Sequence, residues 1–291
     1  MRTERIADGL GWPEGPTVLP DGRVVFVESY RSQLSVWSPD GVERYAYTAG
    51  APNSSVLGAD GAIYVCQNGG TVGPWRAAEM TSASIQRVDR EGGPAEIIAT
   101  EIEGVALNGP NDLVFGLDGW LYFTDPGSYD PAAPQPSYIH ALDPSGQGHV
   151  VIAFETPVFP NGLAVFDDGT LVWDESYTGH VKRRRPDGVI EDLGRMPGDN
   201  PILDGMKIGA DGRLYVTDIV GKGIHVLDAK GAVEDFIACG GGPTNCAFDS
   251  EVLYMTDSGT PADSADASYG GALWRIDLRR AGQRLTTGRI G

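Results

Sequence analysis

"NDLVFGLDGWLYFTD", residues 111–125, places an Asp-Gly pair between two short runs of mainly apolar residues. Asp-Gly supplies the positive φ angles that a tight hairpin turn needs, so the stretch predicts two antiparallel strands. The same arrangement recurs in GPTVLPDGRVVFVES (15–29), SSVLGADGAIYVCQN (54–68), NGLAVFDDGTLVWDES (161–176), DGMKIGADGRLYVTD (204–218) and, less regularly, TNCAFDSEVLYMTDSG (244–259). The chain therefore contains an internal repeat of six hairpins.

Each hairpin is followed by a further apolar run and turn, and 38 to 58 residues separate successive Asp-Gly turns. About four strands fit in each unit, which is the size of one propeller blade. No stretch has the length and periodicity of an amphipathic helix. We therefore predict an all-β fold, a six-bladed β-propeller with four-stranded antiparallel blades around a central channel, as a single domain over residues 1–291. Either TERIA (3–7) or QRLTTGRI (283–290) could supply the last outer strand, and we favour the former.

Composition limits the classes of function. The formal net charge of −18 and pI of about 4.5 disfavour binding to nucleic acid. The basic run 182–185 is interpreted as the solvated edge of a strand.

No run of 18 apolar residues and no secretory leader at residues 1–7 is present, so we expect no membrane partner and a cytoplasmic location. The cysteines form no paired motif and are expected to be buried thiols: Cys66, Cys239 and Cys246. The oligomeric state stays open.

One polar position repeats in every regular unit. Counting back eight residues from each turn glycine reaches a carboxylate or carboxamide, namely Glu14, Asn53, Asn111, Asn161 and Asp204. The sixth unit is irregular and puts Thr244 or Asn245 nearby. Asn and Asp also begin strands simply because their side chains satisfy turn backbone groups. Five equivalent positions that include a Glu, a poor turn residue, favour convergence of these side chains on the propeller axis.

Such a ring has a definite chemistry. The two negative charges of Glu14 and Asp204 match a divalent cation, and neutral amide oxygens from Asn161 and Asn111 add ligands without further charge. Hard oxygen ligands suit Ca²⁺ first, with Mg²⁺ and Mn²⁺ as alternatives. Zn²⁺ is a weaker candidate, because the histidines lie outside this register: His140, His149, His180 and His225. We predict one bound divalent metal ion.

Two further features surround this ring. A second polar register lies six residues after the turn glycine and is expected to make strand-end hydrogen bonds: Glu28, Gln67, Asp125, Glu175 and Asp218. Gly- and Pro-rich insertions at 68–83 and 126–137 are candidate substrate-covering loops, although a purely ornamental role is equally open. Tyr129 and Tyr177, together with Trp75 and Phe159, are predicted to lie at the mouth of the channel, and the two tyrosines are predicted to contact substrate.

The most specific stretches are WPEGPTVLPDG (12–22), LNGPNDLVFGLDGWLYFTDPG (107–127), FPNGLAVFDDG (159–169) and DGMKIGADGRLYVTD (204–218). At these residues the chain resembles the family of senescence marker protein (regucalcin), gluconolactonase and luciferin-regenerating enzyme, which are six-bladed propellers. The resemblance implies that Glu14, Asn111, Asn161 and Asp204 surround a catalytic divalent metal, that Asp204 is also the general base, and that Asn53 lies near substrate. Gly109 stands where regucalcin-type members carry Arg, which points toward the gluconolactonase-like branch.

The resemblance implies a sugar lactonase, a carboxylic-ester hydrolase that opens an aldonolactone by metal-activated water. The chain has no GxSxG nucleophile elbow, which argues against a serine esterase. Two alternatives stay open. One is a metal-dependent phosphotriester or fluorophosphate hydrolase on the same scaffold, and the other is a non-enzymatic interaction propeller with a structural metal.

Overall fold

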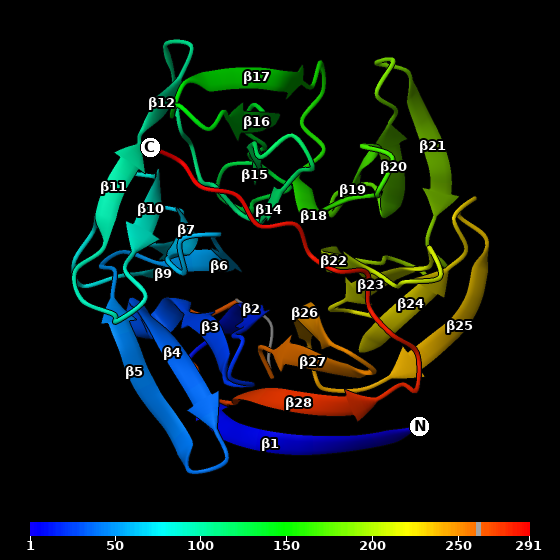
Figure 1. The fold of residues 1–291 in the computed structure, drawn as a ribbon, viewed down its shortest axis with the longest axis horizontal. Coiled ribbons are helices and arrows are strands. Elements are labelled where there is room, and N and C mark those ends of the chain that lie inside the picture. The colour runs from blue at the N-terminus through cyan, green and yellow to red at the C-terminus, as the bar shows by residue number, and fades with distance from the viewer. Residues whose placement is uncertain (260–262) are drawn as a thin grey trace.

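The computed structural model describes residues 1–259 and 263–291, and almost every ordered element in them is a strand. The only helix in this part of the chain is one 3₁₀ turn, η1 (Ser29–Arg31). Six four-stranded antiparallel sheets stand around a common axis, and each sheet directs one of its edge strands inward (Figure 1). The protein is a six-bladed β-propeller, as the hairpin repeat predicts.

The blades share one plan, in which strands follow one another outward from the axis. The innermost strands are β2 (Pro13–Val18), β6 (Pro52–Leu57), β14 (Leu113–Phe115), β18 (Pro160–Val165), β22 (Leu203–Ile208) and β26 (Pro243–Asp249). The second strands are β3 (Val24–Glu28), β7 (Ile63–Gln67), β15 (Leu121–Asp125), β19 (Leu171–Glu175), β23 (Leu214–Asp218) and β27 (Val252–Asp257). The third strands are β4 (Gln33–Ser38), β10 (Ser84–Val88), β16 (Tyr138–Leu142), β20 (His180–Arg184), β24 (Gly223–Leu227) and β28 (Gly271–Asp277). The outer strands are β5 (Gly41–Tyr47), β11 (Glu96–Ala99), β17 (Gly148–Ala153), β21 (Ile190–Arg195), β25 (Val233–Ala238) and β1 (Arg2–Leu10).

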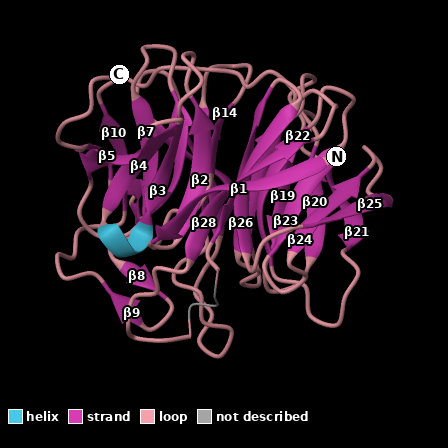
Figure 2. Ribbon diagram, turned by 90° about the horizontal axis from the view of Figure 1, so that it is seen from below, coloured by secondary structure: helices cyan, strands magenta, loops and turns pink. Residues whose placement is uncertain are grey.

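Two small ribbons interrupt this plan. One is formed by β8 (Thr71–Val72) and β9 (Trp75–Arg76), and the other by β12 (Glu101–Ile102) and β13 (Val105–Ala106). The β8–β9 ribbon lies within the insertion 68–83 and projects from one face of the disc, next to η1 (Figure 2). This insertion is therefore positioned to cover that face.

The first strand of the chain closes the ring. β1 pairs antiparallel with β28 over the whole strand, from Arg2 opposite Asp277 to Leu10 opposite Gly271. The outer strand of the sixth blade thus comes from the other end of the chain, so the first and last blades are held together by main-chain hydrogen bonds. This confirms the prediction that residues 3–7 supply that strand.

Apolar side chains fill the spaces between neighbouring blades. The second strands β3, β7, β19 and β23 are buried at every residue. Strands covered on both faces are expected to be continuously apolar rather than alternating. The sequence of β3, VVFVE, shows this composition up to its last residue. Between blades two and three, Tyr64 packs edge-on against Phe115 with 5.3 Å between ring centroids. All three cysteines are buried free thiols, as expected.

The structure contradicts the interpretation of the basic run 182–185 as a strand edge. It lies mostly on β20, which is paired on both sides, by β19 and β21. Acidic side chains lie across from part of the run: Arg183 forms an ion pair of 2.6 Å with Glu191, and Arg185 lies 3.3 Å from the same carboxylate. Acidic residues on β21 therefore allow the run to occupy an interior strand.

A C-terminal strap, residues 279–291, crosses one end of the propeller from the sixth blade to the second (red in Figure 1). Gln283 N donates to Ile208 O (2.8 Å), Ala59 N donates to Gly288 O (2.7 Å), and Ile290 N donates to Tyr64 Oη (3.0 Å). Ile290 is 7% exposed and packs in the core cluster of blades two and three. The strap covers the face that carries the Asp-Gly turns, which leaves the opposite face open. No helix in the described residues is long and apolar enough to cross a membrane.

Replacement of the strap anchor should destabilise the propeller. Ile290→Ala removes a buried side chain from a packed cluster, so we expect the free energy of unfolding to fall by about 2–4 kcal/mol. Leu285→Ala, on the same strap but 39% exposed, should change it by less than about 1 kcal/mol. Urea unfolding followed by tryptophan fluorescence measures both, and equal losses in the two variants would contradict an anchoring role for Ile290.

Candidate metal centre and substrate pocket

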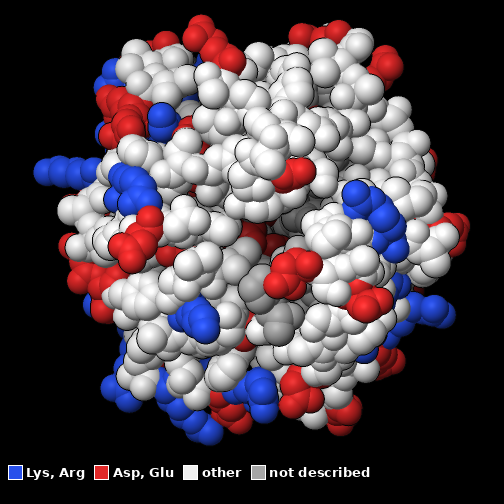
Figure 3. All heavy atoms as spheres, turned by 180° about the vertical axis from the view of Figure 1, so that it is seen from behind, with Lys and Arg blue, Asp and Glu red and all other residues white. Residues whose placement is uncertain are grey.

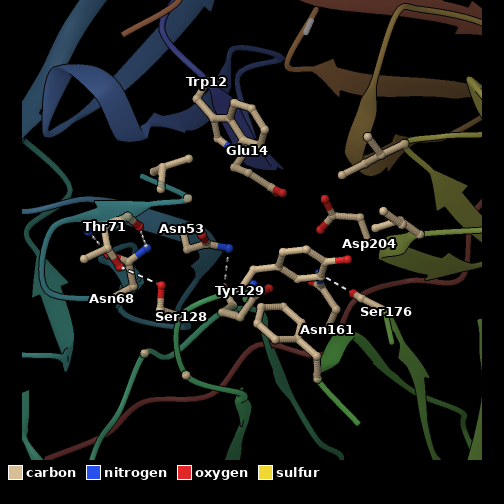
Figure 4. Close-up of a pocket in the computed structure, with 18 of the residues that line it drawn as sticks. Trp12, Glu14, Asn53, Asn68, Thr71, Ser128, Tyr129, Asn161, Ser176 and Asp204 are labelled. Atoms are coloured by element: carbon tan, nitrogen blue, oxygen red, sulfur yellow. Dashed lines mark hydrogen bonds between the residues drawn. The ribbon is translucent and has the colours of Figure 1, made fainter. Parts of the chain in front are cut away.

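The predicted ring residues occupy one structural position. Glu14, Asn53, Asn161 and Asp204 are each the second residue of an innermost strand, while Asn111 lies two residues before β14. In these four strands the first residue pairs with the last residue of the second strand. A register shift follows directly in β6, β18 and β22, and in β2 it follows one pair later, after Glu14. Such bulges turn a side chain out of the sheet. Glu14, Asn161 and Asp204 accordingly point into one cavity on the axis (Figure 4).

Glycine follows the ring residue in three blades, as Gly15, Gly162 and Gly205. A Cβ atom on Gly162 would overlap the carbonyl oxygen of Asp204, and one on Gly205 would overlap the side chain of Asn245. The innermost strands therefore approach one another more closely than any side chain would allow. This close approach brings oxygen atoms from separate blades together.

The second polar register anchors the loops that precede the ring. Asp125 accepts hydrogen bonds from the backbone N–H groups of Asn108 (3.0 Å) and Gly109 (2.7 Å). Gln67, Glu28, Asp218 and Asp257 accept equivalent bonds in their blades, from Ala51, Gly11, Ile202 and Gly242. Glu175 instead accepts from Thr178 Oγ1 (2.7 Å), so the predicted strand-end hydrogen bonding is confirmed for all five residues. In the other five blades these bonds fix the chain two or three residues before the ring position.

A cavity of about 230 Å³ opens above the ring, somewhat smaller than the roughly 300 Å³ at which typical small-molecule sites begin. The hollow lies on the face opposite the strap, with acidic side chains visible inside it (Figure 3). Its lining includes seven of the predicted residues: Glu14, Asn53, Asn111, Asn161, Asp204, Tyr129 and Phe159. Both insertions contribute to the wall, through residues 68, 71–73 and 127–129, so they do reach the cavity as expected of covering loops.

The aromatic wall differs from the prediction at Trp75 and Tyr177, neither of which lines the cavity. The Tyr177 ring packs behind Tyr129 and Phe159, with centroid distances of 5.3 Å to each. Trp12 and Phe159, each two residues before a ring residue, adopt positive φ angles of 54° and 53°. That conformation is strained for bulky residues, and it places both aromatic side chains in the cavity wall. Neither backbone conformation is recognisable from the sequence pattern.

Neither acidic ring residue has a positively charged partner in the part of the chain that the structure describes. Glu14 is 2% exposed and Asp204 is 5% exposed. Burial raises the pKa of Glu14 well above its usual value, and the nearby Asp204 raises it further. Burial also raises the pKa of Asp204 well above its usual value, and repulsion from Asp174 is the second cause of this increase. Two carboxyl groups in this environment need either protons or a cation to coexist.

Asn161 completes a set of oxygen donors. Its Nδ2 donates to Ser176 Oγ (3.1 Å), which in turn donates to Leu203 O (2.6 Å), so the orientation of the amide is fixed. Its Oδ1 is buried and has no hydrogen-bond partner among the described residues. An unpartnered buried oxygen is unfavourable unless something binds to it. Beside two carboxylates, it fits a hard divalent cation, which prefers oxygen ligands.

The donor set is not one that favours zinc. In the described part of the chain, no three His, Cys, Asp or Glu side chains cluster in a way that could hold a metal ion. His140 and His225 lie within the blades, 3.6 Å and 3.1 Å from Asp125 and Asp218. Amide oxygens must therefore complete any shell built on Glu14 and Asp204.

A second polar layer, which the sequence reasoning missed, lies next to the ring. Asp112 accepts hydrogen bonds from Ser54 Oγ (2.6 Å) and Leu113 N (2.9 Å), and Lys207 Nζ lies 3.9 Å from it. Lys207 Nζ also donates to Asn245 Oδ1 (3.2 Å). The adjacency of Asp112 to Asn111 was the available signal, but only the converging strands bring Lys207 to it.

Residues 12–259 match the family model described as SMP-30/Gluconolactonase/LRE-like region. The chain belongs to this family. It is 24% identical over 287 residues to a gluconolactonase of Zymomonas mobilis, covering 84% of this chain and 75% of that protein.

Solved structures share the fold. A gluconolactonase from Xanthomonas campestris superimposes with a TM-score of 0.75 at 23% identity, covering 95% of this chain and 89% of its own. The calcium-binding protein regucalcin from Agrobacterium tumefaciens superimposes with a TM-score of 0.78 at 17% identity, covering 99% and 97% of the two chains. At 23% and 17% identity, these superpositions show a shared fold and no more.

Proposed function

We propose that this chain is a metal-dependent hydrolase of sugar lactones, of the gluconolactonase type. One observation carries the proposal: two buried carboxylates, Glu14 and Asp204, and the unpartnered Asn161 Oδ1 meet at a small-molecule cavity. The family membership and the gluconolactonase among its relatives support the same reaction class.

The proposed metal ligands are Glu14, Asn161 and Asp204, with Asn111 at the edge of the set. Two carboxylates balance a divalent charge, and Ca²⁺ is the ion that accepts mixed carboxylate and amide ligation most readily. A cation bound there supplies a Lewis acid that polarises the lactone carbonyl and stabilises the negative charge of the transition state. Mg²⁺, Mn²⁺ and Zn²⁺ are alternatives for the loading experiments.

In the proposed reaction Asp204 accepts a proton from the attacking water. The water oxygen bonds to the carbonyl carbon, the ring C–O ester bond breaks, and a proton passes to the released oxygen, giving a hydroxy acid. Asn53, Asn111 and Tyr129 hold the substrate through its hydroxyl groups.

Hydrolysis of a lactone panel tests the proposal directly. A pH-indicator assay should show turnover of aldonolactones that is lost after treatment with EDTA and restored by Ca²⁺, Mg²⁺ or Mn²⁺. Paraoxon-like phosphotriesters, assayed in parallel, should be poor substrates. Turnover that persists in the metal-free protein would contradict metal dependence, and preferential hydrolysis of the phosphotriester would favour the rival hydrolase.

Asp204→Asn should separate catalysis from folding. The amide has the same size but cannot accept the proton of water, so kcat should fall by at least about 100-fold while the circular dichroism spectrum stays unchanged. Asp266→Asn, an exposed position outside the cavity lining, is the control and should retain full turnover. Retained activity in Asp204→Asn would reject its role as the base.

Ser176→Ala should weaken metal binding although it replaces none of the proposed metal ligands. The hydroxyl orients Asn161, so its loss should reduce Ca²⁺ affinity about tenfold or more in calorimetry. Ser29→Ala is the matched control. Ser29 is equally buried, follows a second-strand carboxylate in the same way, and donates to Pro52 O of the next blade (2.7 Å). The same loss of affinity in both variants would show a general effect of interblade packing.

A further inference from the structure

We propose that the pocket selects lactones whose substituents are uncharged and discriminates against those that carry a phosphate or carboxylate. The inference rests on the proposed hydrolase function and defines the substrate class of that same site.

The charge of the cavity lining is entirely acidic. Among the lining residues that the structure describes, none is Lys, Arg or His, whereas three are carboxylates: Glu14, Asp204 and Asp263. Residues 260–262 are Thr-Pro-Ala in the sequence and add no basic side chain. A bound divalent cation would neutralise Glu14 and Asp204, and Asp263 would still leave negative charge at the wall.

Arginines from two segments close to the lining are already engaged by the protein. Arg76 Nη1 donates to Gly73 O (2.6 Å) and Trp75 O (2.8 Å). Arg31 is paired with the buried Glu28, donates to Gly9 O (2.8 Å), and lies over the Tyr269 ring. Neither guanidinium belongs to the cavity lining, and moving Arg31 to a ligand would leave Glu28 buried without its ion pair.

A charged substituent would therefore enter an unfavourable environment. A phosphate group carries about −1.5 to −2 charges and is normally recognised by arginine forks or backbone N–H groups. Burying an anion without such a partner is strongly unfavourable. The cation itself could engage the phosphate instead of the lactone carbonyl, which would also prevent hydrolysis. Both effects lower kcat/KM for an anionic lactone.

The remaining lining suits a neutral ring. One part is apolar, with Trp12, Val72, Phe159, Ile202 and Ile219, and another part presents amides and hydroxyls. The side chain of Asn68 already makes hydrogen bonds to the backbone of its own loop. The side chains of Asn111 and Tyr129, which also line the cavity, make no hydrogen bond to another described residue. Hydroxyl groups of a neutral lactone can bind to these uncommitted groups, while the ring packs on the aromatic wall.

The test compares glucono-δ-lactone with its 6-phosphate on the metal-loaded protein at low ionic strength. We expect kcat/KM for the phosphorylated lactone to be at least tenfold lower. Equal or faster hydrolysis of the phosphorylated lactone would overturn the selectivity but leave the proposed hydrolase function standing. Hydrolysis of neither compound, nor of other lactones in the panel, would overturn the proposed function and this inference with it.

A matched pair of variants locates the effect. Asp263→Lys and Asp266→Lys make the same change in net charge on the same exposed segment, but only Asp263 lines the cavity. Asp263→Lys should raise the ratio of phosphorylated to neutral turnover about three- to tenfold, and this gain should shrink in 1 M salt. Asp266→Lys should leave the ratio unchanged. Equal gains in both variants would assign the selectivity to overall charge and overturn the role of the pocket.

Discussion

The crowding of the innermost strands around the axis is the constraint on which the rest of this structure depends. Gly162 and Gly205 lie against the backbone or side chains of the next blade, where a Cβ atom would overlap its neighbour. Because the strands come so close, side chains that leave the sheet at the preceding residue have only the axis to point to. Glu14 and Asp204 therefore meet although 190 residues separate them in the chain.

The rest of the blade supports this arrangement with few types of interaction. Carboxylates or an amide at the ends of the second strands hold the preceding loops through backbone N–H groups, and interblade hydrogen bonds such as that from Ser176 to Leu203 O tie neighbouring blades together. The C-terminal strap holds the six blades together at the face opposite the cavity, and β1 holds them at the outer edge of the sixth blade. A ligand set drawn from several blades can be rigid only if the blades themselves cannot move apart.

Burial explains why this arrangement is suited to chemistry rather than to stability. Two carboxyl groups with raised pKa values, an amide oxygen without a partner and two aromatic residues with strained backbones are all unfavourable in the folded chain. Such features persist when binding to a ligand compensates for them. Their concentration in one cavity supports the interpretation of that cavity as the working site.

The sequence by itself determined the six hairpins and the ring position, because Asp-Gly turns and strand periodicity are local properties that repeat in register. It left two segments that could close the propeller, and the pairing of β1 with β28 decided between them. It also pointed to Glu14, Asn161 and Asp204, since one count from each turn reaches them. Only the tertiary structure decided which groups lie together across blades: Ser176 beneath Asn161, Lys207 beside Asp112, Tyr177 behind rather than in the wall, and β20 between two paired strands. These relations depend on how neighbouring sheets pack and on backbone conformations such as the positive φ of Trp12 and Phe159, which no local pattern specifies.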